Sequence, residues 1–314
     1  MAPPTNTFNE YDGIGNREDL SDVIYNISPF DTPFMSSIAS VDATAQKHEW
    51  QTDALDSASG TNFVEDGLDA ATDAITATAR LYNNCCISDK VPLVSGSQQA
   101  VLKAGRGDEL EYQISKSGKA LKTDMETILL QSNILVAGSS GTASETAGIT
   151  TWLITNLSEA ADATTSTGSG LNARTDGTAR VFTESLLKEV LRETWTSGGN
   201  PDCIMTGAFN KQKFSGFTGN ATREVSANEK ELFASIDVYD SDFGELQVFP
   251  NRFQNAADVL VLQKDMWAVA YLRQFQLHNL AKTGDSERRQ LLAEYALEAR
   301  QEKASGAVLD LTVA

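Results

Sequence analysis

The sequence has few of the residues from which metal centres and disulfide frameworks are built. Its 314 residues include two histidines, His48 and His278, and three cysteines, of which Cys85 and Cys86 are adjacent and Cys203 stands alone. An odd number of cysteines with one adjacent pair is a poor disulfide framework, so we expect reduced, buried thiols in a protein made in a cytoplasm. Two histidines exclude a histidine-rich metal site, and we predict no metal ligands.

Basic charge and long apolar runs are also scarce. Lys and Arg number 25 against 43 Asp and Glu, which gives a formal charge of −18. Affinity for phosphates comes from Lys and Arg, so this balance excludes a protein whose main task is to bind nucleic acid. It suits a soluble protein or one packed densely beside others. No apolar run approaches the roughly 18 residues of a membrane span, and residues 1–4 lack the features of a signal peptide.

The motifs of common catalytic and cofactor sites are incomplete. Gly13-Ile14-Gly15 lacks the third glycine of a dinucleotide-binding turn, and Ser117-Gly118-Lys119 lacks the upstream glycine of a phosphate loop. Arg106-Gly107-Asp108 matches an adhesion tripeptide, but its position before a helix favours a capping role for Asp108. His278 has no obvious Ser or Cys partner in the sequence. We therefore predict no catalytic residues, no cofactor and no enzyme activity.

The longest regular element is predicted from Asp108 to Asn133. Asp108 with Glu111 three residues later resembles a capping box, and no proline interrupts the run. The apolar residues recur at helical spacing within an arc of roughly 100°; they are Leu110, Ile114, Leu121, Met125, Ile128 and Leu129. Lys116, Lys119 and Lys122 fall on nearly the opposite face. One isolated helix of this length in a Gly/Thr/Ser-rich chain indicates a brace across a sheet.

Two segments before this helix are unusual. Residues 1–45 contain four prolines and thinly spread apolar residues, so we expect an arm that must lie on something else. Between His48 and Ala79 there is no Lys or Arg, while the acids are Glu49, Asp53, Asp56, Glu65, Asp66, Asp69 and Asp73. Alternation at both ends predicts a two-stranded excursion with an acidic tip. The acids lack the ligand order of a calcium loop, which favours a solvated acidic face.

The second half of the chain mixes helices and strands. A Ser/Thr/Ala/Gly-rich linker over 138–180 leads to a helix that Thr183 begins, a strand over 202–205 and a helix over 209–217. Strands are predicted over 225–239 and 244–249, and again from 258 to the C-terminus. The alternation from Leu291 to Ala299 fits a strand, although its periodicity also allows a helix. The fold class is therefore α+β.

This order of parts resembles the major capsid proteins of tailed bacteriophages with the Hong Kong 97 fold. It is similar in particular to the phage group once filed as a domain of unknown function and later recognised as capsid subunits. The local matches, in order from about residue 20 to the C-terminus, are Ile27-Ser28-Pro29-Phe30-Asp31-Thr32-Pro33-Phe34, Trp50-Gln51-Thr52-Asp53-Ala54-Leu55, Gly148-Ile149-Thr150-Thr151-Trp152, Ser241-Asp242-Phe243-Gly244, Asn251-Arg252 and Glu294-Tyr295-Ala296-Leu297-Glu298.

The resemblance implies a domain plan and a function. The arm is 1–45, the extended loop 46–82 and the axial domain 150–245. The peripheral domain is 83–149, with its spine helix over 108–133, together with 246–314. The implied function is self-assembly, through hexamers and pentamers, into an icosahedral head shell around double-stranded DNA. A bacterial nanocompartment shell of the same fold is the alternative, and a soluble β-rich enzyme or glycan-binding module is a third hypothesis.

The implied partners are further copies of the chain, scaffolding, portal and decoration proteins, and packaged DNA through weak non-specific contact, with no membrane. Assembly is expected in the bacterial host cytoplasm and the product is the virion capsid. No scaffolding segment precedes the arm, so a separate scaffolding protein or a chain already mature is expected.

The founding phage of the fold cross-links its shell through a loop lysine. Residues 48–79 contain none, so we expect a shell without covalent cross-links. Charge complementarity can fix the register between subunits. The acidic loop is therefore expected to lie on basic groups of a neighbour, with Lys116, Lys119 and Lys122 as one candidate. The competing interpretation is that these lysines face the packaged DNA. Phe8, Phe30 and Phe34 are the expected anchors of the arm on neighbouring subunits.

Overall fold

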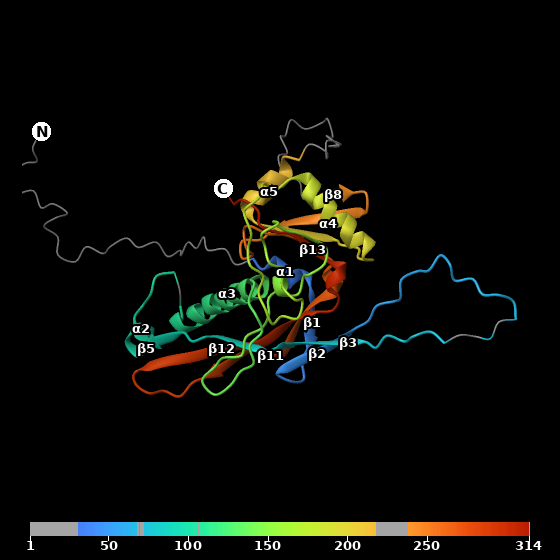
Figure 1. The fold of residues 1–314 in the computed structure, drawn as a ribbon. Helices are drawn as coiled ribbons and strands as arrows, with labels where there is room; N and C mark the ends of the chain where they lie inside the picture. The colour runs from blue at the N-terminus through green and yellow to red at the C-terminus, as the bar shows by residue number, and fades with distance from the viewer. Residues whose placement is uncertain (1–30, 68, 70–71, 106, 218–237, 314) are drawn as a thin grey trace, which may run out of the picture.

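The computed structural model describes residues 31–67, 69, 72–105, 107–217 and 238–313. Its body has two parts (Figure 1). The lower part is built from the helix α3 and the long strands β11 and β12, and the upper part carries α4, α5, β8 and β13. A long excursion between β2 and β3 projects from the side of the body away from α3. Most of the strand predicted over 225–239 lies outside the described residues.

A five-stranded sheet forms the lower part. Its order is β1 (Ala39–Asp42), β11 (Trp267–Asn279), β12 (Ser286–Ala299) and β4 (Cys86–Lys90), and β5 (Leu93–Ser95) also pairs with β12. β1 runs parallel to β11, whereas the other pairs are antiparallel. The segment from Leu291 to Ala299 is thus a strand, because β11 and β4 supply hydrogen-bonding partners on both of its sides.

The helix α3 (Glu109–Leu130) lies against this sheet, as the sequence pattern predicts. Asp108 Oδ1 accepts a hydrogen bond from the backbone N–H of Glu111 at 3.0 Å, which confirms the predicted N-cap. The apolar side chains of Leu121, Met125 and Leu129 are fully buried in the main core, together with Tyr295 and Leu297 of β12.

The C-terminal end of α3 is fixed by residues that follow it. The helix ends at Leu130, three residues before the predicted end. The Asn133 side chain donates to the carbonyl of Ile128, and the Gly148 N–H donates to the carbonyl of Asn133. A Cβ at Gly148 would lie 1.8 Å from the carbonyl oxygen of Gln131, so only glycine fits against this end of the helix.

A six-stranded sheet forms the upper part. Its order is β6 (Leu157–Ser158), β13 (Gly306–Val308), β10 (Val259–Leu262), β7 (Cys203–Thr206), β9 (Gly244–Pro250) and β8 (Val238–Ser241). Together with α4 (Glu184–Thr196) and α5 (Ala208–Ser215) it surrounds a second core that contains Leu187, Val190, Phe214 and Val261. This sheet contains strands from both sides of the predicted boundary. β9, β10 and β13 lie almost wholly in the range 246–314 that the sequence assigns to the peripheral domain, and they belong to the sheet that contains β7.

Shorter elements connect these parts. They are α1 (Pro33–Ser37), the hairpin of β2 (Lys47–Thr52) and β3 (Ala79–Asn84), α2 (Gly96–Ala100), and the 3₁₀ turns Ile149–Thr151, Lys264–Met266 and Glu302–Ala304. Trp152, in the apolar island of the linker, is buried in the main core. No helix within the described residues combines the length and apolar character needed to cross a membrane.

Candidate subunit contact surfaces

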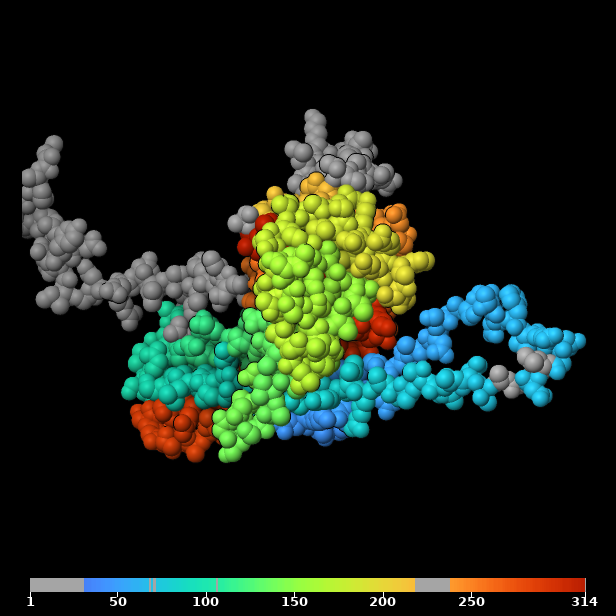
Figure 2. Space-filling view, viewed as in Figure 1, coloured from blue at the N-terminus to red at the C-terminus, as the bar shows by residue number. Residues whose placement is uncertain are grey.

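The extended loop leaves the body from a hairpin that is anchored at its base. β2 and β3 pair from Lys47↔Asn84 to Thr52↔Ala79. His48 Nε2 lies 3.0 Å from Glu298 Oε2 on β12, which ties the hairpin to the lower sheet. Beyond Thr52, every described residue up to Thr78 is exposed and none is in a strand or helix. Figure 2 shows this segment standing clear of the rest of the molecule.

The loop acids are solvated in the single chain. Six of the acids singled out from the sequence are exposed, namely Asp53, Asp56, Glu65, Asp66, Asp69 and Asp73. In the described part of the chain none of the six forms a salt bridge; Asp53 Oδ1 accepts only the neighbouring N–H of Ala54, at 2.9 Å. Within the described residues, the negative charge of the loop is therefore not neutralised by its own subunit.

The loop also exposes large apolar side chains that the sequence analysis did not single out. Leu55 is 99% exposed, Ile75 97%, Phe63 87% and Val64 71%. Their signal was present in the sequence, because they are among the few large apolar residues in a segment of small and acidic ones. These exposed apolar side chains, on a segment that projects from the body, are available for contact with another molecule.

The lysine stripe lies on α3, at a distance from the loop. Lys116, Lys119 and Lys122 are exposed, and the Lys122 Nζ atom lies 5.7 Å from the ring centroid of Phe275 on β11. Because the loop projects from the opposite side of the body, the structure does not bring the stripe and the loop acids together within one chain (Figure 1).

A buried carboxylate, Glu126 of α3, contacts the backbone of α1. Its two oxygens accept the backbone N–H groups of Phe34 and Met35 at 2.8 and 2.9 Å, and one of them also accepts the Asn251 side-chain amide at 2.7 Å. Glu126 is fully buried. Burial raises its pKa, while the three hydrogen bonds act in the opposite direction. Glu126, on α3, therefore connects this helix to residues 34–35 of the arm and to the loop after β9.

This contact corrects one predicted arm anchor. Phe34 is fully buried in the main core of its own chain, so it is not available as an anchor on a neighbour. Phe8 and Phe30 lie outside the described residues. Glu126 could not be recognised from the sequence, because it follows Lys119 by two helical turns and so falls on the polar face of the helix. α1 covers it only in the folded chain.

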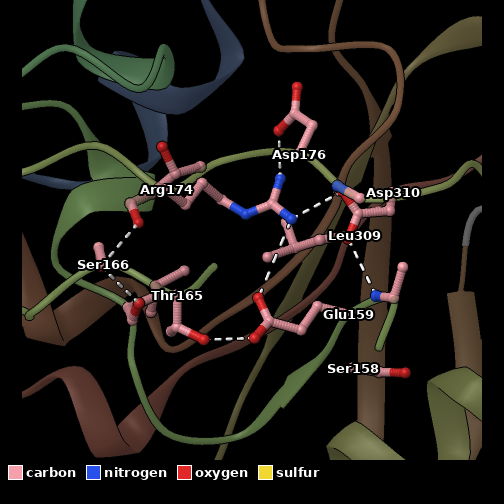
Figure 3. Close-up of polar contacts among 12 residues, drawn as sticks. Ser158, Glu159, Thr165, Ser166, Arg174, Asp176, Leu309 and Asp310 are labelled. Carbon is pink, nitrogen blue, oxygen red and sulfur yellow. Dashed lines mark hydrogen bonds and ion pairs between the residues drawn. The ribbon is translucent and has the colours of Figure 1, made fainter. Parts of the chain in front are cut away.

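A second buried polar cluster surrounds Arg174 (Figure 3). Its Nη2 lies 2.7 Å from Asp310 Oδ1 and 3.9 Å from Glu159 Oε2, and its Nη1 lies 2.5 Å from Asp176 Oδ1. Asp310 Oδ2 also accepts the N–H of Ala160 at 3.0 Å. Burial alone would raise the pKa of Asp310, but these hydrogen bonds outweigh it and lower the pKa below its ordinary value. The cluster ties the linker to the C-terminal segment.

The described residues offer little for catalysis. All three thiols are free and buried, and burial raises the pKa to about 12 for Cys85, about 11 for Cys86 and about 12 for Cys203. Such thiols stay protonated at neutral pH and are poor nucleophiles. Within the described ranges, no group of three or more His, Cys, Asp or Glu side chains is arranged to hold a metal ion.

A projecting hairpin, a long helix across a long-stranded sheet and a separate sheet domain define the class of phage capsid subunits with the Hong Kong 97 fold. Solved structures share it. The capsid of a native GTA particle matches with a TM-score of 0.65 at 12% identity, covering 96% of this chain and 98% of that one. The capsid of Cyanophage A-1(L) matches with a TM-score of 0.65 at 13% identity, covering 95% and 97%. The phage G capsid, which contains decoration proteins beside its major capsid proteins, matches with a TM-score of 0.54 at 11% identity, covering 99% and 100%.

The family follows from the sequence. The model of the SU10 major capsid protein family matches residues 3–312, so the chain belongs to that family. It is 27% identical to the major capsid protein of Escherichia phage Phieco32, over 98% of this chain and 97% of that one. The chain is a major capsid protein of a tailed phage and forms the icosahedral shell of the virion, which confirms the predicted function and sets aside the nanocompartment shell.

Proposed function

We propose that this subunit builds the shell through non-covalent contacts, in which the extended loop lies on a neighbouring subunit. The single observation that carries this proposal is the loop itself, which exposes both acidic and large apolar side chains and whose charge no other described residue neutralises. Burial of the apolar side chains would stabilise the contact by about 25 cal/mol per Å², and the carboxylates would select the register.

The domain boundaries that we propose follow the helices and strands. The arm is 1–45, the extended loop 46–82, and the spine helix belongs to a peripheral domain with β11 and β12. The axial domain holds the six-stranded sheet, so it comprises 150–250 together with β10 and β13. Subunits would meet as pentamers and hexamers, with Phe8 and Phe30 of the arm against neighbours.

We also propose that the subunit interacts with scaffolding and portal proteins and makes weak contact with packaged double-stranded DNA. We propose further that it assembles in the host cytoplasm and has no enzyme activity. Decoration proteins are a partner class because the similar phage G capsid contains them.

The receiving surface for the loop is proposed to be the lysine stripe. Reversal of all three charges, Lys116→Glu, Lys119→Glu and Lys122→Glu, is expected to abolish shell assembly, because each contact turns from attraction to repulsion. Assembly is measured by electron microscopy and light scattering. Reversal of the exposed lysines Lys213, Lys282 and Lys303 changes the net charge equally and should leave more of the assembly intact.

A compensating variant sharpens this test. Exchanging Asp66, Asp69 and Asp73 for lysine in the charge-reversed protein should restore shells. If the stripe variant still assembles normally but packages less DNA, the lysines face the lumen and loop docking on this stripe is wrong.

The absence of covalent cross-links gives a second prediction. Mature shells that are boiled in detergent should run on electrophoresis as a single band at the chain mass of 33.8 kDa. The reason is that residues 48–79 contain no lysine to form an isopeptide bond. A ladder of multiples of that mass that persists after boiling with reductant would contradict the prediction.

A further inference from the structure

The hairpin of β2 and β3 is the place where the extended loop joins the body (Figure 1). From Asp53 to Thr78 the described residues are exposed and belong to no helix or strand, so the direction of the loop depends on how the hairpin is held. Because the chain turns back at the tip, about 13 residues lead outward, and they reach roughly 43 Å when extended. A rotation of about 10° at the base then moves the tip by about 7 Å.

Two side chains hold the hairpin on β12. Asn83 is fully buried; its Nδ2 donates to the carbonyl of Leu297 at 2.8 Å, and its Oδ1 accepts the N–H of Ala147 at 2.9 Å. His48 lies opposite Asn83 in the hairpin, and its Nε2 lies 3.0 Å from Glu298 Oε2. Among the described residues, His48–Glu298 is the one ion pair that joins the hairpin to this sheet. The amide of Asn83 does not titrate, whereas both members of the ion pair do.

Glu298 keeps its negative charge throughout the neutral range of pH. Burial alone would raise its pKa, but the hydrogen bonds from His48 and Arg300 outweigh burial and lower the pKa below the ordinary value of 4.5. The Arg300 Nε donates to the second carboxylate oxygen at 3.0 Å. Histidine is the side chain whose charge ordinarily changes between pH 5 and 8. The contact therefore responds to pH through the imidazole of His48.

The other charges around His48 are engaged elsewhere. Lys47 and Glu49 point to the opposite face of β2, because side chains alternate along a strand. The remaining charged side chains of β2 and β3, and the neighbouring Glu294 of β12, form ion pairs of their own, namely Lys47–Glu49, Arg80–Glu49 and Arg273–Glu294. Hydrogen bonds from Arg80 and Lys47 lower the pKa of Glu49, so its charge is also constant near neutral pH.

Protonation of His48 changes the strength of its contact with Glu298. The protonated ring donates from a positively charged group to the carboxylate, whereas a neutral ring with its proton on Nε2 donates without that charge. Charge-assisted hydrogen bonds are roughly twice as strong as neutral ones. The contribution of the contact is therefore fully present while His48 is protonated, and part of it is lost as the pH rises through the titration of the ring.

We propose that the His48–Glu298 contact is a pH-sensitive hinge of the extended loop, which holds the hairpin firmly on β12 when His48 is protonated and loosens it when the ring is neutral. In the unassembled subunit the loop then has fewer accessible directions at mildly acidic pH than at mildly basic pH. The hinge acts within one chain and does not depend on which surface of a neighbour receives the loop.

Amide hydrogen exchange in residues 47–52 and 79–84 of the full chain, kept unassembled at low concentration, tests the proposal. After correction for the intrinsic effect of pH on exchange, the wild type should be protected about fivefold more at about pH 5.5 than at about pH 8. His48→Gln should be protected equally at both values, because glutamine donates without a charge. The matched control His278→Gln replaces the second histidine of the chain, which is exposed on β11, and should keep the wild-type dependence.

A further variant leaves the histidine in place. Glu298→Gln keeps an acceptor oxygen but removes the negative charge, so the difference in protection between the two pH values should fall to about twofold or less. Equal protection of the wild-type hairpin at both pH values would overturn the proposal. A full fivefold difference that survives in His48→Gln or in Glu298→Gln, or one that disappears in His278→Gln, would overturn it as well.

Discussion

Glu126→Ala is expected to lower the free energy of unfolding of the subunit by about 4 kcal/mol. The substitution leaves three buried donors without an acceptor, namely the N–H groups of Phe34 and Met35 and the amide of Asn251. Unsatisfied buried donors cost about 1–3 kcal/mol each, and the lost side chain also leaves a cavity. Chemical denaturation of the unassembled subunit measures the effect.

Two further variants separate this contact from general damage to α3. Glu126→Gln keeps one oxygen as acceptor but turns its amide nitrogen toward a donor, so we expect a smaller loss of about 2 kcal/mol. Glu111→Ala changes an exposed acid of the same helix and should shift stability by no more than about 0.5 kcal/mol. If Glu126→Ala lowers the free energy of unfolding no more than Glu111→Ala does, the Glu126 carboxylate does not stabilise the contact between α3 and residues 34–35.

Arg174→Met is expected to cost a similar amount, about 3–5 kcal/mol, because it leaves the Asp310 carboxylate buried without its cation. The loss should depend on pH. The pKa of Asp310 is lowered in the folded wild type, so its contribution is present above the ordinary value of 3.8 and is lost as pH falls through the lowered pKa. Without Arg174, burial raises the pKa of Asp310 in the folded variant, so the stability difference between wild type and variant should begin to shrink above the ordinary value and continue to shrink as pH falls to the lowered wild-type pKa. Denaturation at several pH values measures it.

The controls for Arg174 use its partner. The double variant Arg174→Met, Asp310→Asn no longer contains the unpaired Asp310 carboxylate, so it should be more stable than Arg174→Met alone. Arg252→Met removes an exposed arginine near the same loop and should have little effect. A single variant as stable as the wild type would show that the ion pair contributes nothing to holding the linker.

Features that depend on neighbours within one or two helical turns, or on alternation along a strand, were readable from the sequence. The N-cap at Asp108, the apolar face of α3 and the paired ends of the extended loop are of this kind. The absence of Lys and Arg between residues 48 and 79 is also a property of the sequence. These local patterns were sufficient for the fold class and the resemblance to a capsid family.

Contacts between residues far apart in the chain were decided by the tertiary structure. Glu126 meets Phe34 across 92 positions and Arg174 meets Asp310 across 136, and neither pair leaves a local pattern. The segment from Leu291 to Ala299 became a strand only because β11 and β4 flank it. β10 joined the upper sheet because β7 offered an edge with which it could complete its backbone hydrogen bonds, and β13 then paired with the other edge of β10. Periodicity records which side of an element is apolar, whereas the partner that covers that side depends on how the whole chain folds.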